Sequence, residues 1–181
     1  MPSRKERDME QPPLEIERKF LIRMPDIATL TAQPGCRVLE LVQTYLAAPQ
    51  GVTARVRQCR EGARLTWWRT EKRRLSDKTA IENEAEIEET TYRAALATAD
   101  PTRRPIEKRR YAIPYAGHIL EIDVYPFWED CAILEVELQS EDEAFALPPY
   151  LTLIREVTAD RRYKNAQLAK HIPPDPWKED I

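Results

Sequence analysis

Glycine is scarce in this chain, with only four among 181 residues, and the four are scattered. A loop that cradles phosphate with its backbone amides needs closely spaced glycines, so the sequence excludes a P-loop nucleotide site. Cysteine is also rare, and no Cys-x-x-Cys pair occurs; the three are Cys36, Cys59 and Cys131. A disulfide framework or a zinc site is therefore not expected, and reduced thiols are typical of a cytoplasmic protein.

Long apolar segments and an excess of one charge are missing as well. No run reaches the length of a membrane-spanning helix, and the polar start, residues 1–8, is not followed by the apolar stretch of a secretion signal. Although 33% of the residues are charged, the net charge is only −3. No overall field favours nucleic acid or an anionic membrane, and we expect a cytoplasmic protein that binds neither. The two histidines, His118 and His171, are expected at surface or turn positions.

What the chain does contain is a series of alternating segments. They predict strands over residues 14–22, 36–47, 53–60, 63–69, 83–88, 105–114, 118–126 and 131–139. Helices are expected over 26–32, 90–99, 140–145 and 165–171, and a charged loop over 70–80. Many strands with few short helices indicate an α+β protein with an antiparallel barrel or sheet. We expect one domain over residues 14–172, a disordered tail over 1–13 and a second tail over 173–181.

Six of these strands carry a same-sign charged pair on one face, because residues i and i+2 of a strand point the same way. The acidic pairs are Glu15/Glu17, Glu84/Glu86, Glu121/Asp123 and Glu135/Glu137; the basic pairs are Arg55/Arg57 and Lys108/Arg110. A solvated sheet face would explain any one of them. Like charges on neighbouring strands repel, however, so their recurrence favours a barrel whose charged faces line a wet channel.

Such a channel has a specific chemistry. Carboxylate oxygens suit Mg²⁺ or Mn²⁺, whereas arginine and lysine suit phosphate. Carboxylates, a metal ion and basic side chains together are what phosphoryl transfer requires. The spacing alone therefore indicates a polyphosphate site and leaves open what the phosphates are attached to.

A family resemblance adds to this interpretation. Glu15-x-Glu17-x-Lys19 resembles the ExExK signature of the CYTH superfamily of triphosphate tunnel metalloenzymes, which includes class IV adenylyl cyclases, thiamine triphosphatases and bacterial inorganic triphosphatases. Later motifs follow in the family's order: Gln43-Thr44-Tyr45-Leu46, Arg55-x-Arg57, Leu65-Thr66, Glu84-x-Glu86, Glu107-Lys108-Arg109-Arg110-Tyr111, Leu120-Glu121-Ile122-Asp123-Val124 and Leu134-Glu135-Val136-Glu137. The ending, residues 156–165, is similar to the bacterial branch.

The resemblance implies an eight-stranded antiparallel β-barrel, or tunnel, with helices packed outside it. It implies that Mg²⁺ or Mn²⁺ is held by Glu15, Glu17, Glu121, Asp123, Glu135 and Glu137. It assigns the triphosphate to Lys19, Arg55, Arg57, Lys108, Arg110, Arg162 and Lys164, with Lys164 closing one end of the tunnel. Glu15, Glu17 and Lys19 would be catalytic, with the glutamates orienting the attacking water. A homodimer is a further family-based expectation.

Two positions depart from the family pattern. Trp68 stands where Leu-Thr-x-Lys would place a phosphate-binding lysine, and Glu82 stands where an arginine often precedes the central Glu-x-Glu pair. The sequence thus predicts a tunnel with two fewer cations. We expect metal-dependent hydrolysis of inorganic triphosphate or a small organic triphosphate. The alternatives are cyclisation of ATP and a non-catalytic module that binds polyphosphate or a phosphorylated ligand.

Overall fold

The computed structural model describes residues 13–174, which form antiparallel strands connected by turns, loops and short helices. The strands are β1 (Leu14–Arg23), β2 (Arg37–Leu46), β3 (Thr53–Glu61), β4 (Arg64–Arg74), β5 (Thr79–Ile87), β6 (Ile106–Tyr115), β7 (His118–Val124), β8 (Cys131–Leu138) and β9 (Leu153–Glu156). The helices are α1 (Ile27–Thr31), α2 (Glu89–Ala95), η1 (Leu96–Thr98), η2 (Arg161–Tyr163) and α3 (Asn165–Leu168). The tails predicted over 1–13 and 173–181 lie, apart from residues 13, 173 and 174, outside the described residues.

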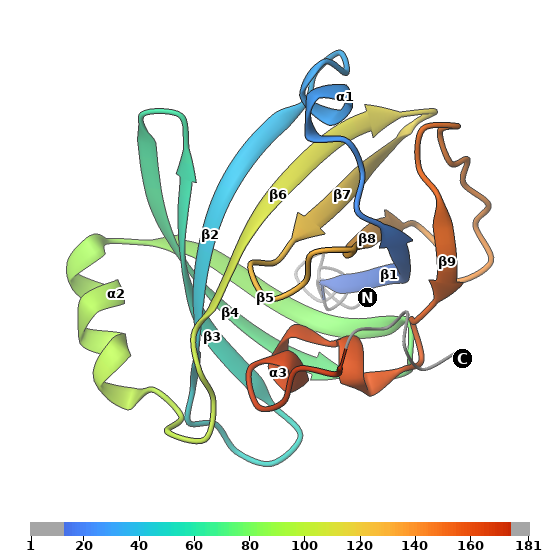
Figure 1. The fold of residues 1–181 in the computed structure, drawn as a ribbon. Coiled ribbons are helices and arrows are strands. Elements are labelled where there is room, and N and C mark those ends of the chain that lie inside the picture. The colour runs from blue at the N-terminus through green and yellow to red at the C-terminus, as the bar shows by residue number, and fades with distance from the viewer. Residues whose placement is uncertain (1–12, 175–181) are drawn as a thin grey trace, which may run out of the picture.

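Eight of the strands close into an antiparallel barrel, as predicted (Figure 1). Neighbours follow the order β5-β4-β3-β2-β6-β7-β8-β1, and a β1–β5 pairing joins the ends of the sheet. That closing pairing is short, from Leu14 opposite Ile81 to Ile16 opposite Thr79. Beyond it, the same edge of β1 pairs with β9 from Phe20 to Ile22. The ninth strand therefore extends one seam of the barrel without being part of the closed ring.

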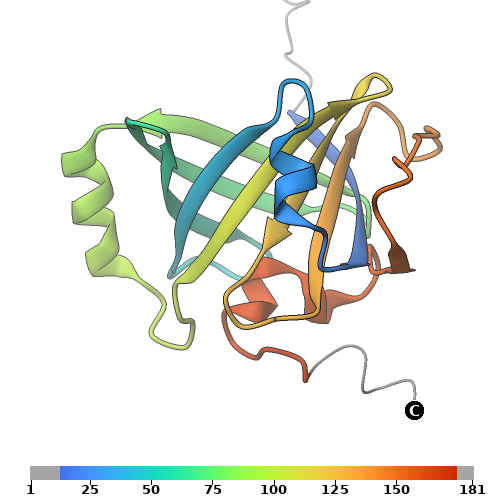
Figure 2. The same cartoon turned by 45° about the horizontal axis from the view of Figure 1, so that its top comes forward.

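Apolar side chains on the outer face of the barrel are covered by the helices and a long loop (Figure 2). One cluster, which includes Phe20, Tyr111 and Leu120, lies under Leu30 of α1 and against the loop at Phe145. A second, which includes Val56 and Trp67, lies under Tyr92 of α2. Burying the outer face in this way leaves the charged face of each strand pointing inward. None of the described helices combines the length and the hydrophobicity that crossing a membrane would require.

One end of the barrel interior is filled by an apolar plug. Inward-facing Leu21, Tyr45 and Ile133 pack with Tyr163 and Leu168 from the C-terminal helices, all of them buried. The strands that supply these residues carry their charges further along, on the same face. The barrel interior is thus apolar at the end near α3 and charged in its middle.

Three expectations about elements were wrong. Residues 70–80 are not a loop, because β4 runs on to Arg74 and β5 begins at Thr79. Residues 140–145 are not helical; Phe145 lies 5.5 Å from Phe20, ring centre to ring centre, so this segment serves as an extended cover of the outer core. Strand β9 was not predicted; it forms because β1 has a free edge where β5 leaves it.

Candidate active site

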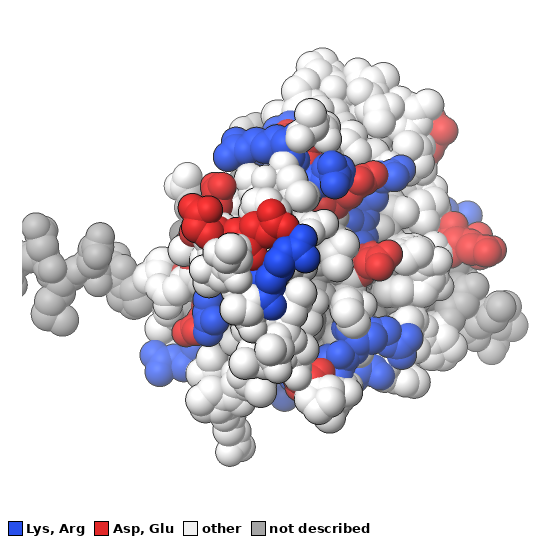
Figure 3. Space-filling model, turned by 90° about the vertical axis from the view of Figure 1, so that its left-hand side faces the viewer, with Lys and Arg blue, Asp and Glu red and all other residues white. Residues whose placement is uncertain are grey.

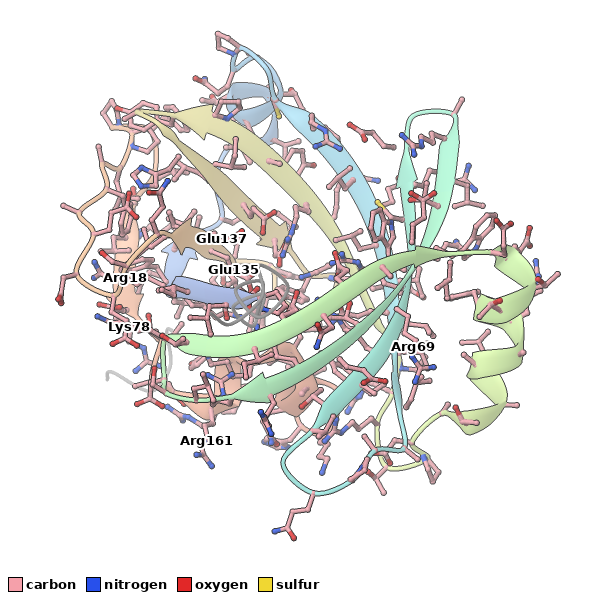
Figure 4. All side chains as sticks on the ribbon, turned by 180° about the vertical axis from the view of Figure 1, so that it is seen from behind. Arg18, Arg69, Lys78, Glu135, Glu137 and Arg161 are labelled. Carbon is pink, nitrogen blue, oxygen red and sulfur yellow. The ribbon has the colours of Figure 1, made fainter. Side chains whose placement is uncertain are left out.

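The charged faces of the strands meet in a cavity of about 240 Å³ inside the barrel. Twelve of the fifteen side chains that the sequence placed in pairs or assigned to the site line it: Glu15, Glu17, Lys19, Arg55, Arg57, Glu84, Lys108, Arg110, Glu121, Glu135, Glu137 and Lys164. Further lining residues are Tyr45, Thr53, Thr70, Lys72, Arg74, Glu82, Asn165 and Ala166. Figure 4 labels Glu135 and Glu137 on β8, within the ring of strands. We call this cavity the tunnel.

An acidic cluster forms where β1 meets β5, around a single ammonium group. Lys72 contacts Glu15 directly, and its Nζ lies 3.9 Å from a Glu17 oxygen and 3.3 Å from a Glu82 oxygen. One positive charge thus faces three carboxylates. Burial and the neighbouring charges of Glu17 and Glu82 raise the pKa of Glu15 to about 7. Burial and the charges of Glu82 and Glu17 also raise the pKa of Glu137. This part of the tunnel is short of positive charge.

Lys19 links the acidic cluster to the next strand. Its ammonium is buried and lies 2.5 Å from a Glu135 oxygen. Burial favours the neutral lysine, but the charges of Glu135 and Glu17 outweigh it and raise the pKa of Lys19. The third member of the Glu15-x-Glu17-x-Lys19 motif is therefore a charged lysine held by a carboxylate.

The basic pair on β6 is locked into a buried ion network. Arg110 donates to both Asp123 oxygens, from Nε at 2.6 Å and from Nη2 at 2.8 Å, and to Glu135 at 2.8 Å. It also contacts Glu121, and Lys108 contacts Asp123. Burial lowers the pKa of Lys108, and the nearby Arg110 charge lowers it further, to about 8. Both cations already have anionic partners within the protein.

The basic pair on β3 is far less committed. Arg57 donates to Glu84 at 3.0 Å, and Arg55 lies 3.8 Å from the same carboxylate. Thr70 donates to Glu84 at 2.6 Å and so fixes that carboxylate between the two arginines. Among the residues that the structure describes, the buried Nε atoms of Arg55 and Arg57 have no hydrogen-bond partner. Two guanidinium groups therefore face the tunnel with donors to spare.

Lys164 stands at the end of the tunnel where α3 begins. Its Nζ is buried, donates no hydrogen bond to the described part of the chain, and lies 3.8 Å from a Glu17 oxygen. Burial and the charge of Lys19 lower its pKa to about 8. Lys164 thus lines the tunnel beside α3, and its role in closing that end stays a prediction.

Three predicted site residues lie elsewhere. Asp123 is fully buried and does not line the tunnel, because Lys108 and Arg110 cover its carboxylate. Glu86 sits at the rim with 49% of its side chain exposed, 3.8 Å from Arg64. Arg162 is 51% exposed and pairs with Asp160 on the outside, at 2.9 Å. The expected metal role of Asp123 and phosphate role of Arg162 have no support from these positions.

One of the two cations that the sequence appeared to lack is supplied by Lys72, once the register of β4 and β5 is known. Thr70 and Lys72 lie opposite Glu84 and Glu82 in the β4–β5 ladder, and all four line the tunnel. The Thr-x-Lys spacing is thus met four residues later than Leu65-Thr66 suggested, at Thr70 and Lys72. The central acidic pair in the tunnel is Glu82 with Glu84. The recurrence of Thr-x-Lys at positions 70–72 was the signal that could have revealed this.

The alternation of side chains along β4 places its basic residues on two different faces. Lys72 and Arg74 line the tunnel, whereas Arg69 lies on the outer side of the strand (Figure 4). On the outer face seen in Figure 3, basic and acidic side chains are interspersed. Separate clusters of acidic and of basic side chains are found inside the barrel rather than on that face.

The carboxylates of the tunnel are the residues that could hold a metal ion. In residues 13–174, no three acidic, histidine or cysteine side chains converge on one point as they stand. The donor chemistry nevertheless fits a hard divalent cation, because Glu15, Glu17 and Glu82 are oxygen ligands gathered around the single ammonium group of Lys72.

Comparison with known proteins gives a consistent result. The inorganic triphosphatase of Nitrosomonas europaea is 34% identical over 165 residues, covering 88% of this chain and 99% of that protein. The inorganic triphosphatase of Acetivibrio thermocellus is 39% identical over 67 residues, covering 36% of this chain and 42% of that protein. A solved inorganic triphosphatase structure matches with a TM-score of 0.54 at 32% identity, covering 88% of this chain and 97% of that one. No family model matches the chain.

The length and identity of the first of these matches leave the relationship plain. The likeness covers most of this chain and nearly all of that protein. It confirms the resemblance to the CYTH superfamily that the N-terminal motif predicted, in its bacterial branch. The chain belongs to the inorganic triphosphatase family.

Proposed function

We propose that this protein hydrolyses inorganic triphosphate, or a small organic triphosphate, inside the tunnel with the help of a divalent metal ion. Water attacks the terminal phosphorus, the bond from that phosphorus to the bridging oxygen breaks, and the products of tripolyphosphate are phosphate and diphosphate. Two relatives named as inorganic triphosphatases support the reaction class.

One observation carries the proposal from the structure itself. The buried Arg55 Nε, Arg57 Nε and Lys164 Nζ line a single cavity and lack hydrogen-bond partners within residues 13–174. Leaving buried donors unsatisfied costs free energy, so a site that keeps three of them is built for a ligand that accepts hydrogen bonds. A polyphosphate has both the charge and the acceptor oxygens that these groups require.

The acidic cluster supplies the second half of the site. Glu15, Glu17, Glu135 and Glu137 are the residues we propose to hold Mg²⁺ or Mn²⁺, and Glu82 joins them. When bound, such an ion neutralises charge that develops on phosphate oxygens. The raised pKa of Glu15 and of Glu137 supports the assignment, because each reflects carboxylates that repel one another and that a cation would relieve.

The side chains divide the remaining work. Arg55, Arg57 and Lys164 hold the polyphosphate by its oxygens. Glu15 and Glu17 orient the attacking water. Burial raises the pKa of Glu17, but the charges of Lys19 and Lys72 outweigh it and keep that carboxylate ionised. Arg110 fixes Glu135, and Lys108 pairs with Asp123 behind it. The substrate is thus clamped between a basic wall on β3 and an acidic wall on β1 and β8.

Phosphate release from tripolyphosphate, ATP and thiamine triphosphate, each with Mg²⁺ or Mn²⁺ and with a chelator, tests the proposal. We expect turnover of at least one substrate, and a loss of kcat of at least about a hundredfold in Glu17→Gln. Glu86→Gln is the matched control, because it makes the same substitution at the rim, and it should keep its activity. Binding of tripolyphosphate without turnover by wild type would leave only a binding module, and release of cyclic AMP would replace hydrolysis by cyclisation.

The proposal also covers where the protein acts and how it assembles. We propose that the protein acts in the cytoplasm on a small-molecule substrate, without nucleic acid or membrane partners, and that one domain spans residues 14–172. The absence of disulfides among the three described cysteines agrees with a reducing compartment. The expected homodimer stays a prediction that sedimentation can test.

A further inference from the structure

A second cavity lies at the mouth of the tunnel, beside the turn that joins β3 to β4. It encloses about 290 Å³ and is lined from β2, β3, β4 and β5. Arg57 and Glu84 line both this cavity and the tunnel. A ligand held by Arg57 can therefore extend from one into the other. We call this second cavity the mouth pocket.

The charged side chains of the mouth pocket already have ion-pair partners, and Arg64 lies 3.8 Å from Glu86 outside the pocket. Arg37 makes two bonds of 2.7 Å to the carboxylate of Glu61. Arg57 and Glu84 are paired at 3.0 Å on the tunnel side. The pocket thus differs from the tunnel, where Glu15, Glu17 and Glu82 share the ammonium group of Lys72. A balanced lining gives no reason for a further phosphate to bind here.

The apolar part of the pocket is built around Trp68. Its Nε1 donates to Thr66 Oγ1 at 3.0 Å, which satisfies the polar edge of the indole and fixes the plane of the ring. Trp68 lies opposite Arg57 on β3 and Glu86 on β5, so it belongs to the inward face. Leu39 and Cys59 complete the apolar lining. The pocket offers a half-buried ring face with no unmet hydrogen bond.

We propose that the mouth pocket binds the planar heteroaromatic ring of an organic triphosphate whose polyphosphate chain lies in the tunnel. The inference rests on the proposed function and names its substrate class: a triphosphate ester that carries a ring, such as a nucleoside triphosphate. The ring stacks on Trp68, since aromatic side chains stack on any base through its π face. Arg57 holds the phosphate that leaves the tunnel toward the pocket. Trp68 thus acquires a role in substrate choice, while the lysine of the Thr-x-Lys pattern is Lys72.

Kinetics on three probes test this: tripolyphosphate, ribose 5-triphosphate and ATP. In Trp68→Leu the KM for ATP should rise about tenfold, while the values for the two ringless probes change less than about twofold. Trp68→Phe keeps a stacking surface and should restore most of the lost affinity. An equal change for all three probes, or no change for ATP, would overturn the ring site and leave triphosphate hydrolysis standing.

A readout independent of turnover uses the thiol in the pocket. Alkylation of Cys59 by N-ethylmaleimide, followed peptide by peptide with mass spectrometry, should be slowed at least about fivefold by saturating ATP and little by tripolyphosphate. Cys36, outside both cavities, is the internal control. If both ligands protect Cys59 equally, the pocket does not hold the ring. If no triphosphate is hydrolysed, the hydrolase proposal fails, and selective protection by ATP still decides the ring site.

Discussion

Two strands of this barrel carry the same motif, a basic residue on either side of one other residue, and they use it in opposite ways. On β6, Lys108 and Arg110 are held by Asp123, and Arg110 also by Glu135. On β3, Arg55 and Arg57 share the single carboxylate of Glu84. The difference lies in the neighbouring strands: β7 offers acids to β6, whereas β4 offers Thr70 and Trp68 to β3.

The ionisation of the two arginines reflects this difference. Burial lowers the pKa of Arg110, but Asp123 and Glu121 outweigh it, and the pKa ends above its usual value. Burial and the like charge of Arg55 together lower the pKa of Arg57. A cation that is saturated by anions contributes to the fold, and one that is under-compensated is ready for an anionic ligand. We infer that β6 stabilises the barrel and β3 binds the substrate.

The largest effect should come from breaking the β6 network. Arg110→Met leaves Asp123 buried with Lys108 as its only cation, and we expect the free energy of unfolding to fall by about 3–5 kcal/mol. Chemical denaturation at neutral pH measures this. The double variant Arg110→Met with Asp123→Leu removes the stranded charge and should recover part of the loss. A decrease below about 1 kcal/mol in the single variant would mean that the network contributes little to the fold.

The reverse pattern is expected for Arg57 on β3. Arg57→Gln should cost about 1 kcal/mol of stability or less, because its partner Glu84 keeps Thr70 and Arg55. Its kcat/KM for tripolyphosphate should fall by about a hundredfold, since a charge-assisted contact to phosphate is lost. Arg57→Lys keeps the charge and should recover only part of the activity, because a lysine cannot offer two donors in a plane. If Arg57→Gln instead costs about 3 kcal/mol of stability or more and leaves kcat/KM unchanged, β3 rather than β6 stabilises the barrel.

Lys164 should make the affinity for tripolyphosphate depend on pH. Its pKa of about 8 means that it is charged below that pH and neutral above it, so its attraction for an anion is present at pH 7 and lost as the pH rises past 8. Tripolyphosphate affinity measured by calorimetry, without metal, should fall by about tenfold between pH 7 and pH 9. Lys164→Arg stays charged over this range, so any slope that it shares with wild type belongs to the ligand. Identical slopes in the two proteins would remove Lys164 from the binding site.

The sequence predicted the barrel and most of its lining because the informative strands are amphipathic. Leu134 and Val136 alternate with Glu135 and Glu137, so the apolar face reveals the charged one. Residues 69–74 have no such alternation: both faces of β4 are polar there, one toward water and one toward the tunnel, and the segment was interpreted as a loop. Lys72 was missed for that reason. Asp123 has the predicted phase, but its burial under Lys108 and Arg110 depends on how β6 and β7 pair, which periodicity does not specify.

The smallest effect should come from Arg69, and it tests the phase of β4 directly. Arg69 lies opposite Val56 and Ala85, on the outer face, and pairs at 3.0 Å with the exposed Glu71. An exposed pair of this kind contributes roughly 0.2–1 kcal/mol, so Arg69→Gln should change stability by less than about 1 kcal/mol and kcat/KM by less than about twofold. Lys72→Gln, three residues along on the inner face, should lower turnover, because Glu15, Glu17 and Glu82 lose their shared counter-charge. If Arg69→Gln costs tenfold in kcat/KM while Lys72→Gln is silent, β4 is shifted by one residue, and Trp68 then lies outside the mouth pocket.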